Sequence, residues 1–395
     1  MSRVFVTGIG LVTPLGLGVQ PNLVGLRAGR CGITSMEYTL SKFASLLPFG
    51  EVKFSNDQLC EMLQVESKGI TRTSLLSLLA FQEAIQQSNI SLSELQQSST
   101  ALVGASTVGG MCLTDELYSD ANKLKDASDY ISSYDGGSVA LYLQQKYKIG
   151  GIINTFNTAC SSSANAIMYG ARLIKHGLAK TAIVGGADSL AKFTINGFNS
   201  LRILSKNKCT PFDAHRSGLN LGEGAAYLVL QGEETIQDQK IFAELTGYSN
   251  ANDAFHPTSL SDDGDGPYAS MQQALTKADI NPSDISFINT HGTGTENNDL
   301  IESIAMKRLF QTVPLFASTK SNIGHTLGAA SAIEAAFSIF SILHQEVYPH
   351  INFTESIAET GLTPVTAYQQ RPINHVMSNS FGFGGNCSSL IFSKV

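Results

Sequence analysis

The stretch "NTACSSSANAI" (Asn157–Ile167) places a cysteine between an apolar run and an amphipathic segment. We expect Cys160 at or just before a helix N-terminus, because apolar residues recur after it at helical spacing, at Ala164, Ile167, Met168, Ala171 and Ile174. Unpaired amides and the helix dipole there favour a thiolate and can bind an oxyanion, and the serines can cap amides. A lone cysteine is more often a buried structural residue, so its neighbours must decide.

Two histidines and a charged pair form the second set of candidate residues. His291 ends an apolar run in "NTHGTGTENND", and "STKSNIGHTLGAASAIEAA" contains Lys320, His325 and Glu334. A lone histidine is more often a structural hydrogen-bonding group, but two in Gly/Thr-rich turns at strand ends favour a site. A Gly-rich turn, "NSFGFGGNCSS", lies near the C-terminus. Together these residues favour a nucleophilic cysteine over a structural one.

Strand-like and helical segments alternate along the chain and must position these residues. The strand-like runs are "RVFVTGIG", "TALVGAS", "GIINTFN", "AKTAIVGGAD", "GAAYLVLQG", "ISFINTHG", "PLFAST" and "SSLIFS". Helical patterns lie between them, for example at 75–87 and 329–344. This alternation predicts an α/β fold with helices on both sides of its sheets. Each half has a strand, a turn with a reactive residue and a small-residue helix, which would fit a duplicated fold.

Composition excludes several classes of protein. With 395 residues, 43% of them hydrophobic, the chain can bury a large core in two domains or two fused halves. The formal net charge of −7 argues against a general nucleic-acid-binding surface. We expect no membrane insertion, because no apolar run approaches the ~18 residues that span a bilayer and no signal-like segment opens the sequence.

Two further composition signals concern cofactors and location. The six cysteines show no CxxC pair and no metal-like spacing, which predicts a reduced, cytoplasmic protein with no metal centre. The segment "GIGLVT" (Gly8–Thr13) lacks the third glycine of a dinucleotide fingerprint, so no dinucleotide site is expected.

Seven segments occur in the order found in one enzyme family: "RVFVTGIGLVTPLG", "NTACSSSANAI", "AIVGGADS", "PFDAHRSGLNLGEGAA", "NTHGTGTENND", "STKSNIGHTLGAASAIEAA" and "NSFGFGGN". Through them the chain resembles, essentially end to end, the β-ketoacyl-acyl carrier protein synthases of the elongating Cys-His-His type. These are condensing enzymes of the thiolase-like superfamily. The resemblance implies an α/β, thiolase-like fold of two pseudo-symmetric halves in α-β-α-β-α layers, each half with a mixed five-stranded sheet. The halves would be 1–238, carrying the nucleophile, and 239–395, carrying both histidines.

The resemblance also assigns roles to residues. Cys160 would hold the acyl chain as a thioester, and His291 and His325 would bind the malonyl thioester and promote its decarboxylation. The amides of Cys160 and Phe381 would form the oxyanion hole, with Phe381 also gating the acyl pocket. Lys320 and Glu334 match a supporting charged pair, and Thr293 and Thr295 match ligands of the pantetheine arm. Val108 matches a position in the acyl pocket, and Gly382, Gly384 and Gly385 match the hinges of the gate. Arg202 matches a contact for the carrier protein, for which Lys68 and Arg72 are weaker candidates. Structural roles stay open for the charged pair, the threonines and Val108.

The implied reaction is a decarboxylating Claisen condensation of an acyl thioester with malonyl-acyl carrier protein, which gives 3-oxoacyl-acyl carrier protein. Phosphopantetheine arrives on the carrier protein, so no resident cofactor is implied beyond a structural monovalent cation. The family forms homodimers through the strand before the nucleophile, and a heterodimer with a related subunit stays open. Residues 215, 217, 294, 386 and 387 depart from the usual pattern, which leaves fatty-acid elongation and polyene or polyketide elongation equally open.

Three alternatives compete with an elongating enzyme. A non-catalytic partner subunit that sets chain length would typically lack the nucleophile, yet Cys160, His291 and His325 are all present. A thiolase or an initiating synthase would need a second catalytic cysteine in the final turn, or asparagine in place of His325. A cysteine hydrolase gives no role to "STKSNIGHTLGAA". The residues therefore favour the condensing enzyme.

Overall fold

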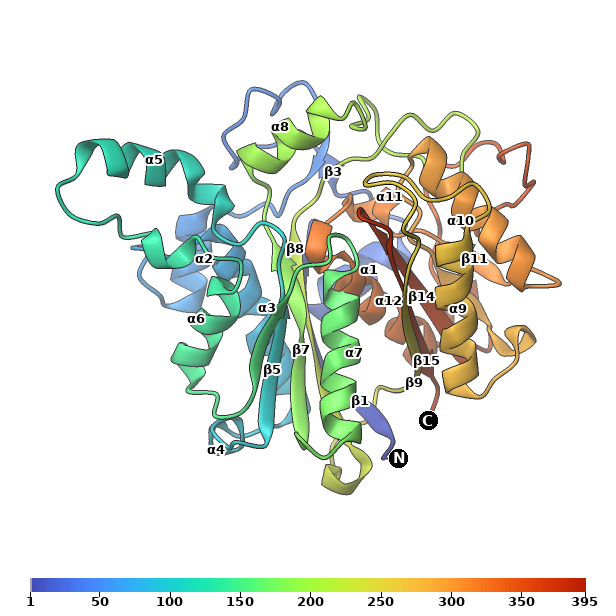
Figure 1. Cartoon of the computed structure of the whole chain (residues 1–395), viewed down its shortest axis with the longest axis horizontal. Coiled ribbons are helices and arrows are strands. Elements are labelled where there is room, and N and C mark those ends of the chain that lie inside the picture. Colours follow the sequence, from blue (N-terminus) through green and yellow to red (C-terminus); the bar gives the residue numbers. More distant parts are fainter. Residues whose placement is uncertain (1) are drawn as a thin grey trace.

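The computed structural model describes residues 2–395, which fold into layers of helices and sheet (Figure 1). The strands are β1 (Val4–Thr13), β2 (Gly16–Leu17), β3 (Ile33–Thr34), β4 (Phe49–Gly50), β5 (Thr100–Ala105), β6 (Ile153–Phe156), β7 (Thr181–Asp188), β8 (Gly224–Gly232), β9 (Ala243–Asn252), β10 (Phe287–Asn289), β11 (Leu315–Ala317), β12 (Glu346–Val347), β13 (Gln369–Gln370), β14 (His375–Gly382) and β15 (Asn386–Ser393). The helices are α1 (Val19–Arg27), α2 (Asn56–Leu63), α3 (Arg72–Ser88), α4 (Leu92–Leu95), α5 (Thr114–Lys123), α6 (Ser138–Tyr147), α7 (Ser162–Lys175), α8 (Lys192–Ser200), α9 (Asp265–Ala278), α10 (Glu296–Leu309), α11 (Lys320–Ile323) and α12 (Ala330–His344).

The sheet repeats one strand order twice. The first half runs β6-β5-β7-β8-β1 and the second β11-β10-β14-β15-β9, with parallel pairing among the first three strands of each run and antiparallel pairing afterwards. This is the duplicated architecture of mixed five-stranded sheets that the sequence predicts. One difference is that β1 and β9 also pair, at Phe5 with Glu244 and Val6 with Ala243, so the two halves join edge to edge. The boundary predicted at residue 238 lies between β8 and β9.

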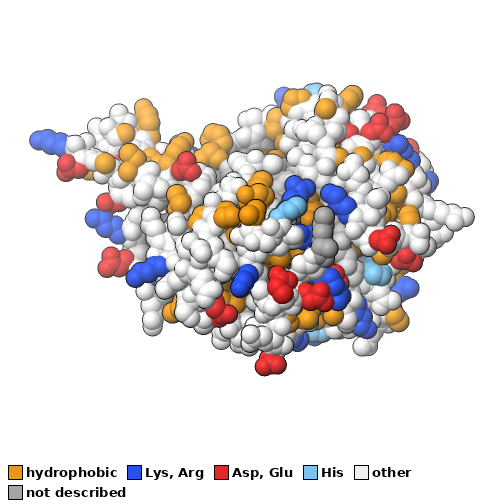
Figure 2. Space-filling view, turned by 60° about the horizontal axis from the view of Figure 1, so that its bottom comes forward, with side chains coloured by type: hydrophobic (Ala, Val, Ile, Leu, Met, Phe, Trp, Pro, Cys, Tyr) orange, Lys and Arg blue, Asp and Glu red, His pale blue; other side chains and the backbone are white. Residues whose placement is uncertain are grey.

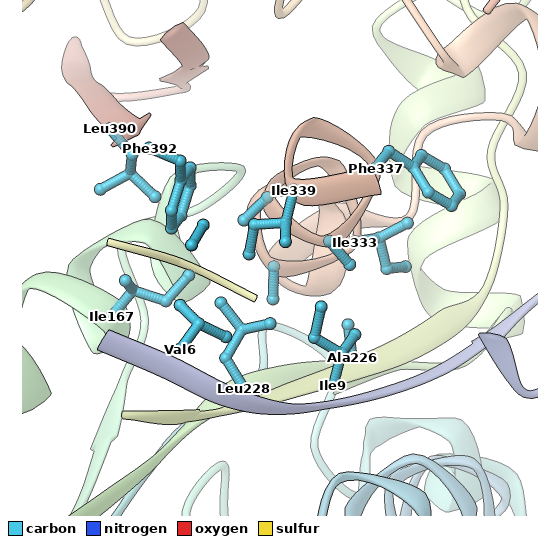
Figure 3. Close-up of a cluster of buried hydrophobic side chains, with 14 of the residues drawn as sticks. Val6, Ile9, Ile167, Ala226, Leu228, Ile333, Phe337, Ile339, Leu390 and Phe392 are labelled. Atoms are coloured by element: carbon cyan, nitrogen blue, oxygen red, sulfur yellow. The ribbon is translucent and has the colours of Figure 1, made fainter. Parts of the chain in front are cut away.

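Helices cover and separate the two halves in the predicted α-β-α-β-α order. Helix α3 packs on β1 and β8, helices α7 and α12 lie between the halves, and α9 packs on β9 and β15 (Figure 1). Apolar side chains from both sheets meet the two central helices in one core, shown in Figure 3 by Val6, Ile9, Ile167, Ala226, Leu228, Ile333, Phe337, Ile339, Leu390 and Phe392. Helices α7 and α12, which carry the site, therefore form the central layer, and a sheet packs against each side of that layer.

Helix α12 corrects one expectation from the sequence. The segment Leu327–His344 is 18 residues long with a mean hydropathy of 1.5, so by length and composition alone it could cross a membrane. It is 89% buried inside the protein. A helix packed between two sheets has no face in water and is apolar all round, which explains its composition as that of a core helix.

Candidate active site

Cys160 lies in a sharp turn between β6 and α7. Ala159 before it has a φ of 52°, in the left-handed region that a residue with a side chain enters at a cost. Helix α7 begins two residues later, at Ser162, and only 6% of Cys160 is exposed. The prediction that this cysteine directly precedes a helix N-terminus is confirmed.

The three serines do not cap α7 as predicted. Ser161 Oγ donates to the carbonyl of Thr158, Ser162 Oγ donates to the carbonyl of Ala159, and Ser163 Oγ accepts from an amide of α12. They hold the turn and fasten it to α12. No side chain of residues 2–395 caps the first amides of α7, so these donors and the helix dipole remain available to negative charge on Cys160.

Cys160, His291 and His325 come together at the ends of three segments far apart in sequence. The Cys160 sulfur and one ring nitrogen of each histidine all lie within 4.8 Å of one another. The imidazole rings are nearly perpendicular, with centroids 5.5 Å apart, and each histidine is 2% exposed. The structure thus assembles the predicted triad in a setting that excludes bulk water.

Hydrogen bonds to Nδ1 determine where each neutral imidazole carries its proton. The amide of Leu327 donates to His325 Nδ1 at 3.0 Å, and the Lys320 ammonium lies 3.3 Å from His291 Nδ1. A nitrogen that accepts a hydrogen bond carries no proton, so the N–H of each ring is on Nε2. Both histidines therefore act as donors at Nε2.

Lys320 and Glu334 form a buried ion pair behind His291. Each is 1% exposed, and the Lys320 ammonium binds both the Glu334 carboxylate and, at 2.6 Å, the carbonyl of His291. Burial raises the pKa of Glu334, and Lys320 opposes that rise. Removal of either partner would leave the other as an uncompensated buried charge, so the pair fixes α11 and α12 together beneath the site.

Burial keeps the triad uncharged at neutral pH. It raises the pKa of the Cys160 thiol to about 11, and the charge of Lys320 and the amide of Phe383 only partly oppose that rise. Burial and the charge of Lys320 also hold the pKa of both His291 and His325 well below the usual range. The sequence predicts an easily formed thiolate, whereas the resting structure holds a thiol, because the turn that aims the sulfur also removes it from water.

The amide that hydrogen-bonds the Cys160 sulfur belongs to a different phenylalanine from the one predicted for the oxyanion hole. The backbone amide that hydrogen-bonds the Cys160 sulfur is that of Phe383. Phe381 lies within β14, opposite Cys387 of β15, and its ring packs edge-on against the His291 ring, with centroids 5.9 Å apart. Phe383 stacks on Phe198 of α8, with centroids 5.9 Å apart. The sequence "FGF" does not show which phenylalanine places its amide beside Cys160, because both phenylalanines neighbour flexible glycines.

The cavity at the site has a volume of about 200 Å³. Thr293 and Thr295 line it together with all three triad residues, Phe381, Gly382 and Phe383, and the two threonine hydroxyls are 2.8 Å apart. Gly382 packs so closely on the nucleophile turn that a Cβ would lie 2.8 Å from the Thr158 carbonyl. Gly384 has a φ of 84° and free space around it, so it could act as a hinge.

The predicted residues Val108, Arg202 and Lys68 do not themselves line this cavity. Val108 is 1% exposed and belongs to a separate apolar cluster that also contains Leu327 and Phe198. Arg202 is exposed between two residues that line the cavity mouth, Leu201 and Ile203. Lys68 is exposed and pairs with Asp129.

Arg72 is not available to a carrier protein. Its guanidinium is buried and forms a bidentate pair with Glu223, at 2.6 Å for the shortest contact. Two backbone carbonyls, of Val52 and Phe54, take further hydrogens of the same group. Arg72 therefore stabilises the interior of the first half.

Two carboxylates of α10 were missed by the sequence reasoning. Glu302 accepts the amides of His291 and Gly292, and Asp299 accepts those of Thr293 and Gly294. Two acidic side chains one turn apart thus hold four consecutive amides of the histidine turn. The signal was an i, i+3 acidic pair directly after "HGTGT", on a helix face that must turn inward.

The structure shows what surrounds two of the residues that depart from the usual family pattern, Gly294 and Asn386. Gly294 has a φ of 81°, and a Cβ there would lie 2.8 Å from the Gly218 carbonyl. Asn386 accepts hydrogen bonds from Ser161, Asn165 and Asn250 behind the nucleophile turn. Neither residue contacts the triad atoms, so both shape the support of the site.

The fold and the Cys-His-His centre define a condensing enzyme of the thiolase-like class. The β-ketoacyl synthase N-terminal domain family matches residues 1–235, and the C-terminal domain family matches residues 242–354. The chain therefore belongs to the β-ketoacyl synthase family.

Individual relatives agree. The 3-oxoacyl-[acyl-carrier-protein] synthase 2 of Rhizobium meliloti (strain 1021) is 35% identical over 422 residues, covering 100% of this chain and 99% of the relative. The solved ishigamide ketosynthase/chain length factor superposes with a TM-score of 0.92 at 27% identity, covering 100% and 99% of the two chains. A ketosynthase solved with its type II polyketide synthase acyl-carrier protein has a TM-score of 0.88 at 26% identity and full coverage of both chains.

Proposed function

We propose that this enzyme extends an acyl chain by decarboxylating condensation with malonyl-acyl carrier protein, using Cys160 as the nucleophile. The observation that carries this proposal is the buried cluster of one thiol and two imidazoles that line the cavity, with Nδ1 of each imidazole held by another group so that Nε2–H is its free donor. Such a cluster offers an acyl acceptor together with two hydrogen-bond donors, which are the groups that a condensation of two thioesters needs.

In the first step, the Cys160 sulfur attacks the thioester carbonyl of an acyl-acyl carrier protein. The C–S bond to Cys160 forms, the C–S bond to phosphopantetheine breaks, and the thiol proton passes to the departing pantetheine sulfur. The amides of Cys160 and Phe383 stabilise the oxyanion of the tetrahedral intermediate. The free amides of α7 and the charge of Lys320 stabilise negative charge on the sulfur as its proton leaves.

In the second step, the malonyl thioester loses CO2 and leaves an enolate. Nε2–H of His291 and of His325 donate to the thioester oxygen, which gains negative charge as the C–C bond to CO2 breaks. The enolate carbon then attacks the acyl carbonyl on Cys160, which forms the new C–C bond and breaks the C–S bond to Cys160. The sulfur leaves as a thiolate and takes up a proton from water to restore the thiol. Because both imidazoles are neutral donors, neither must give up its proton during decarboxylation.

The acyl carrier protein is the proposed partner at the cavity mouth. The exposed Arg202 stands beside the opening, where it could meet an acidic carrier. The hydroxyls of Thr293 and Thr295 face the cavity and could hydrogen-bond the amides of a pantetheine arm. A ketosynthase of the same fold has been solved with its acyl-carrier protein, which supports this partner.

We also propose a dimer formed through β6. This strand is the last in its sheet, so one of its edges has no neighbour in the described chain. The arm that carries α5 projects from the molecule at the upper left of Figure 1. Exposed apolar side chains gather along that arm (Figure 2), among them Tyr118, Leu124, Ile131 and Tyr134. A second copy of this chain is the proposed occupant, with a related subunit as the alternative that the ketosynthase/chain length factor structure supports.

We further propose a structural monovalent cation beside the ion pair. Two buried oxygens, Asn289 Oδ1 and Glu334 Oε2, have no hydrogen-bond donor within the described residues. Asn289 Nδ2 donates to the Glu334 carbonyl at 3.2 Å, so the two residues are neighbours. Unpaired buried oxygens are costly, and a K⁺ or Na⁺ ion would satisfy both. We expect a higher Tm in KCl than in choline chloride at equal ionic strength, and equal values would contradict the cation.

The cellular location is proposed as cytoplasmic. All six cysteines are free, as expected of a protein in a reducing compartment.

The proposed function is tested by product formation with purified components. Wild type, His291→Ala and His325→Ala are each incubated with a hexanoyl-acyl carrier protein and malonyl-acyl carrier protein. Wild type should give a 3-oxoacyl product two carbons longer, and each histidine variant should become acylated at Cys160 yet form that product at least about 100-fold more slowly. Product that forms only after a related subunit is added, and forms equally well with Cys160→Ala, would support the chain-length-setting partner instead.

A further inference from the structure

Asp188 is a buried carboxylate that joins two loops of the site. It ends β7, in the segment "AIVGGADS", and is 0% exposed. Its Oδ1 accepts from the amide of Val108 at 2.9 Å and from Ser106 Oγ at 2.7 Å. Its Oδ2 accepts from the amide of Gly328 at 2.7 Å and from Thr107 Oγ1 at 2.7 Å. The reaction described above gives this residue no role.

The surroundings of Asp188 demand two hydrogen-bond acceptors. The amides of Val108 and Gly328 can only donate, and each points to a different oxygen of the carboxylate. Asparagine would therefore set its NH2 group against one of the two amides and leave that amide unpaired. Burial raises the pKa of Asp188, and its donors oppose the rise.

Gly328 connects Asp188 to the catalytic histidine through one residue. Leu327 has a φ of 54°, a left-handed conformation that costs a leucine about 1 kcal/mol. In this conformation its amide donates to His325 Nδ1. The next peptide unit is held by the bond from the Gly328 amide to Asp188, and a Cβ on Gly328 would lie 2.9 Å from Asp188 Oδ2. The strained backbone is thus fixed by the carboxylate.

The main chain of His325 itself is held separately. Its amide donates to the Asn220 carbonyl at 2.7 Å, and its carbonyl accepts from the amide of Gly222 at 2.9 Å. Loss of the Asp188 contact would therefore leave the His325 backbone in place. It would release the Leu327 amide that sets the ring orientation and tautomer.

We propose that Asp188 is a positioning residue that keeps the proton of His325 on Nε2, by holding Leu327 and Gly328 against the loop of Val108. This inference rests on the proposed function and adds a link between two parts of the site. The loop at Val108 belongs to the apolar cluster beside the cavity, so the same carboxylate ties the predicted acyl pocket to the decarboxylating histidine.

The test separates the two chemical steps in Asp188→Asn. Acylation of Cys160 by an acyl-acyl carrier protein should stay within about 3-fold of wild type, whereas condensation should fall about 100-fold, the effect of a displaced catalytic group. Adding Asp188→Asn to His325→Ala should cause no further loss, because the variant acts only through that ring.

Asp213→Asn is the matched control. Asp213 is also buried and accepts from the amides of His215, Thr354 and Glu355, but it contacts none of the triad. This control should leave both steps within about 3-fold of wild type. If Asp188→Asn does not fold, Gly328→Ala attacks the same contact from the other side and should give the same split.

Equal losses in both steps, or a further loss in the His325→Ala background, would overturn the role of Asp188. An inactive wild type would instead overturn the proposed function, and this inference with it.

Discussion

Proton positions at the site follow from contacts of single residues. His325 receives a backbone amide at Nδ1, and His291 faces the Lys320 ammonium. A third buried histidine, His350, follows the same rule: its Nδ1 accepts from the Ser318 amide at 3.0 Å and its Nε2 lies 3.0 Å from the Pro211 carbonyl. Each ring is neutral because burial penalises its charged form.

His350 makes this rule measurable in stability. Burial lowers its pKa to about 4, from an ordinary value of 6.5. Between pH 6.5 and 4 the unfolded chain binds a proton that the folded chain refuses, so this histidine's contribution to stability falls as pH falls. His350→Gln keeps the donor and acceptor without titrating. Its unfolding free energy should gain about 2 kcal/mol relative to wild type between pH 7.5 and pH 5, measured by urea denaturation.

A pH-independent difference between the two proteins would contradict a buried neutral His350. The wild type must be compared with a variant, because titration of Glu302 changes the unfolding free energy with pH in the opposite direction. Burial raises its pKa to about 7, so the folded chain binds the extra proton there.

Packing of whole elements depends on glycines where helices meet strands. Helix α3 lies so close to β1 that a Cβ on Gly10 would sit 1.7 Å from the Ala80 carbonyl. In α8, by contrast, a Cβ on Gly197 would meet no atom within 4 Å. The contact of α3 with β1 fixes one outer layer. Helix α8 lies at the top of the molecule in Figure 1, and its Phe198 lines the cavity.

Gly10→Ala and Gly197→Ala should therefore have opposite effects. We expect Gly10→Ala to lower the unfolding free energy by at least about 3 kcal/mol, because backbone must move to admit the methyl group. Gly197→Ala should raise it by roughly 0.5–1 kcal/mol through helix propensity. Chemical denaturation measures both, and a tolerated Gly10→Ala would show that α3 does not pack on β1 as described.

For the whole molecule, the free edge of β6 is the feature that predicts assembly. The Thr155 amide takes no part in the β5 ladder and instead binds the side chain of Asn154 at 2.8 Å. A partner strand could take over that outward-facing amide. The proposed dimer would then continue the sheet from one subunit into the next.

Thr155→Pro removes this amide with little effect on the β5 side of the strand. Light scattering after gel filtration should show a dimer for wild type and a monomer for the variant, with Asn154→Ala as a control that keeps the backbone amide. Persistence of a dimer in Thr155→Pro would place the interface elsewhere.

Much of this molecule could be predicted from its sequence, because fold and triad each leave local patterns. The helical spacing after Cys160 located the nucleophile turn, and the seven ordered segments implied the duplicated fold. The acidity of the thiol could not be predicted, since it depends on how far the turn is buried. The prediction that the serines cap the helix was wrong, because Ser161, Ser162 and Ser163 form hydrogen bonds with partners that only the folded chain brings near.

Contacts between distant segments account for the other misses. "FGF" offers two candidate amides beside the Cys160 sulfur, and only the register of β14 with β15 selects Phe383 over Phe381. Arg72 looks like a surface cation until Glu223, 151 positions away, is placed beside it. The pair of acids on α10 carries a local signal, but its partners are backbone amides, which leave no trace in sequence.

Intact-protein mass spectrometry with acyl-carrier-protein thioesters tests the central claim, that Cys160 accepts the acyl chain. Wild type and Cys160→Ala are each mixed with a panel of acyl-acyl carrier proteins and weighed. Wild type should gain the mass of one acyl group, Cys160→Ala should gain none, and the preferred acyl group would distinguish a fatty-acid from a polyene pathway. No acyl gain by wild type from any member of the panel, or an equal gain by Cys160→Ala, would contradict it.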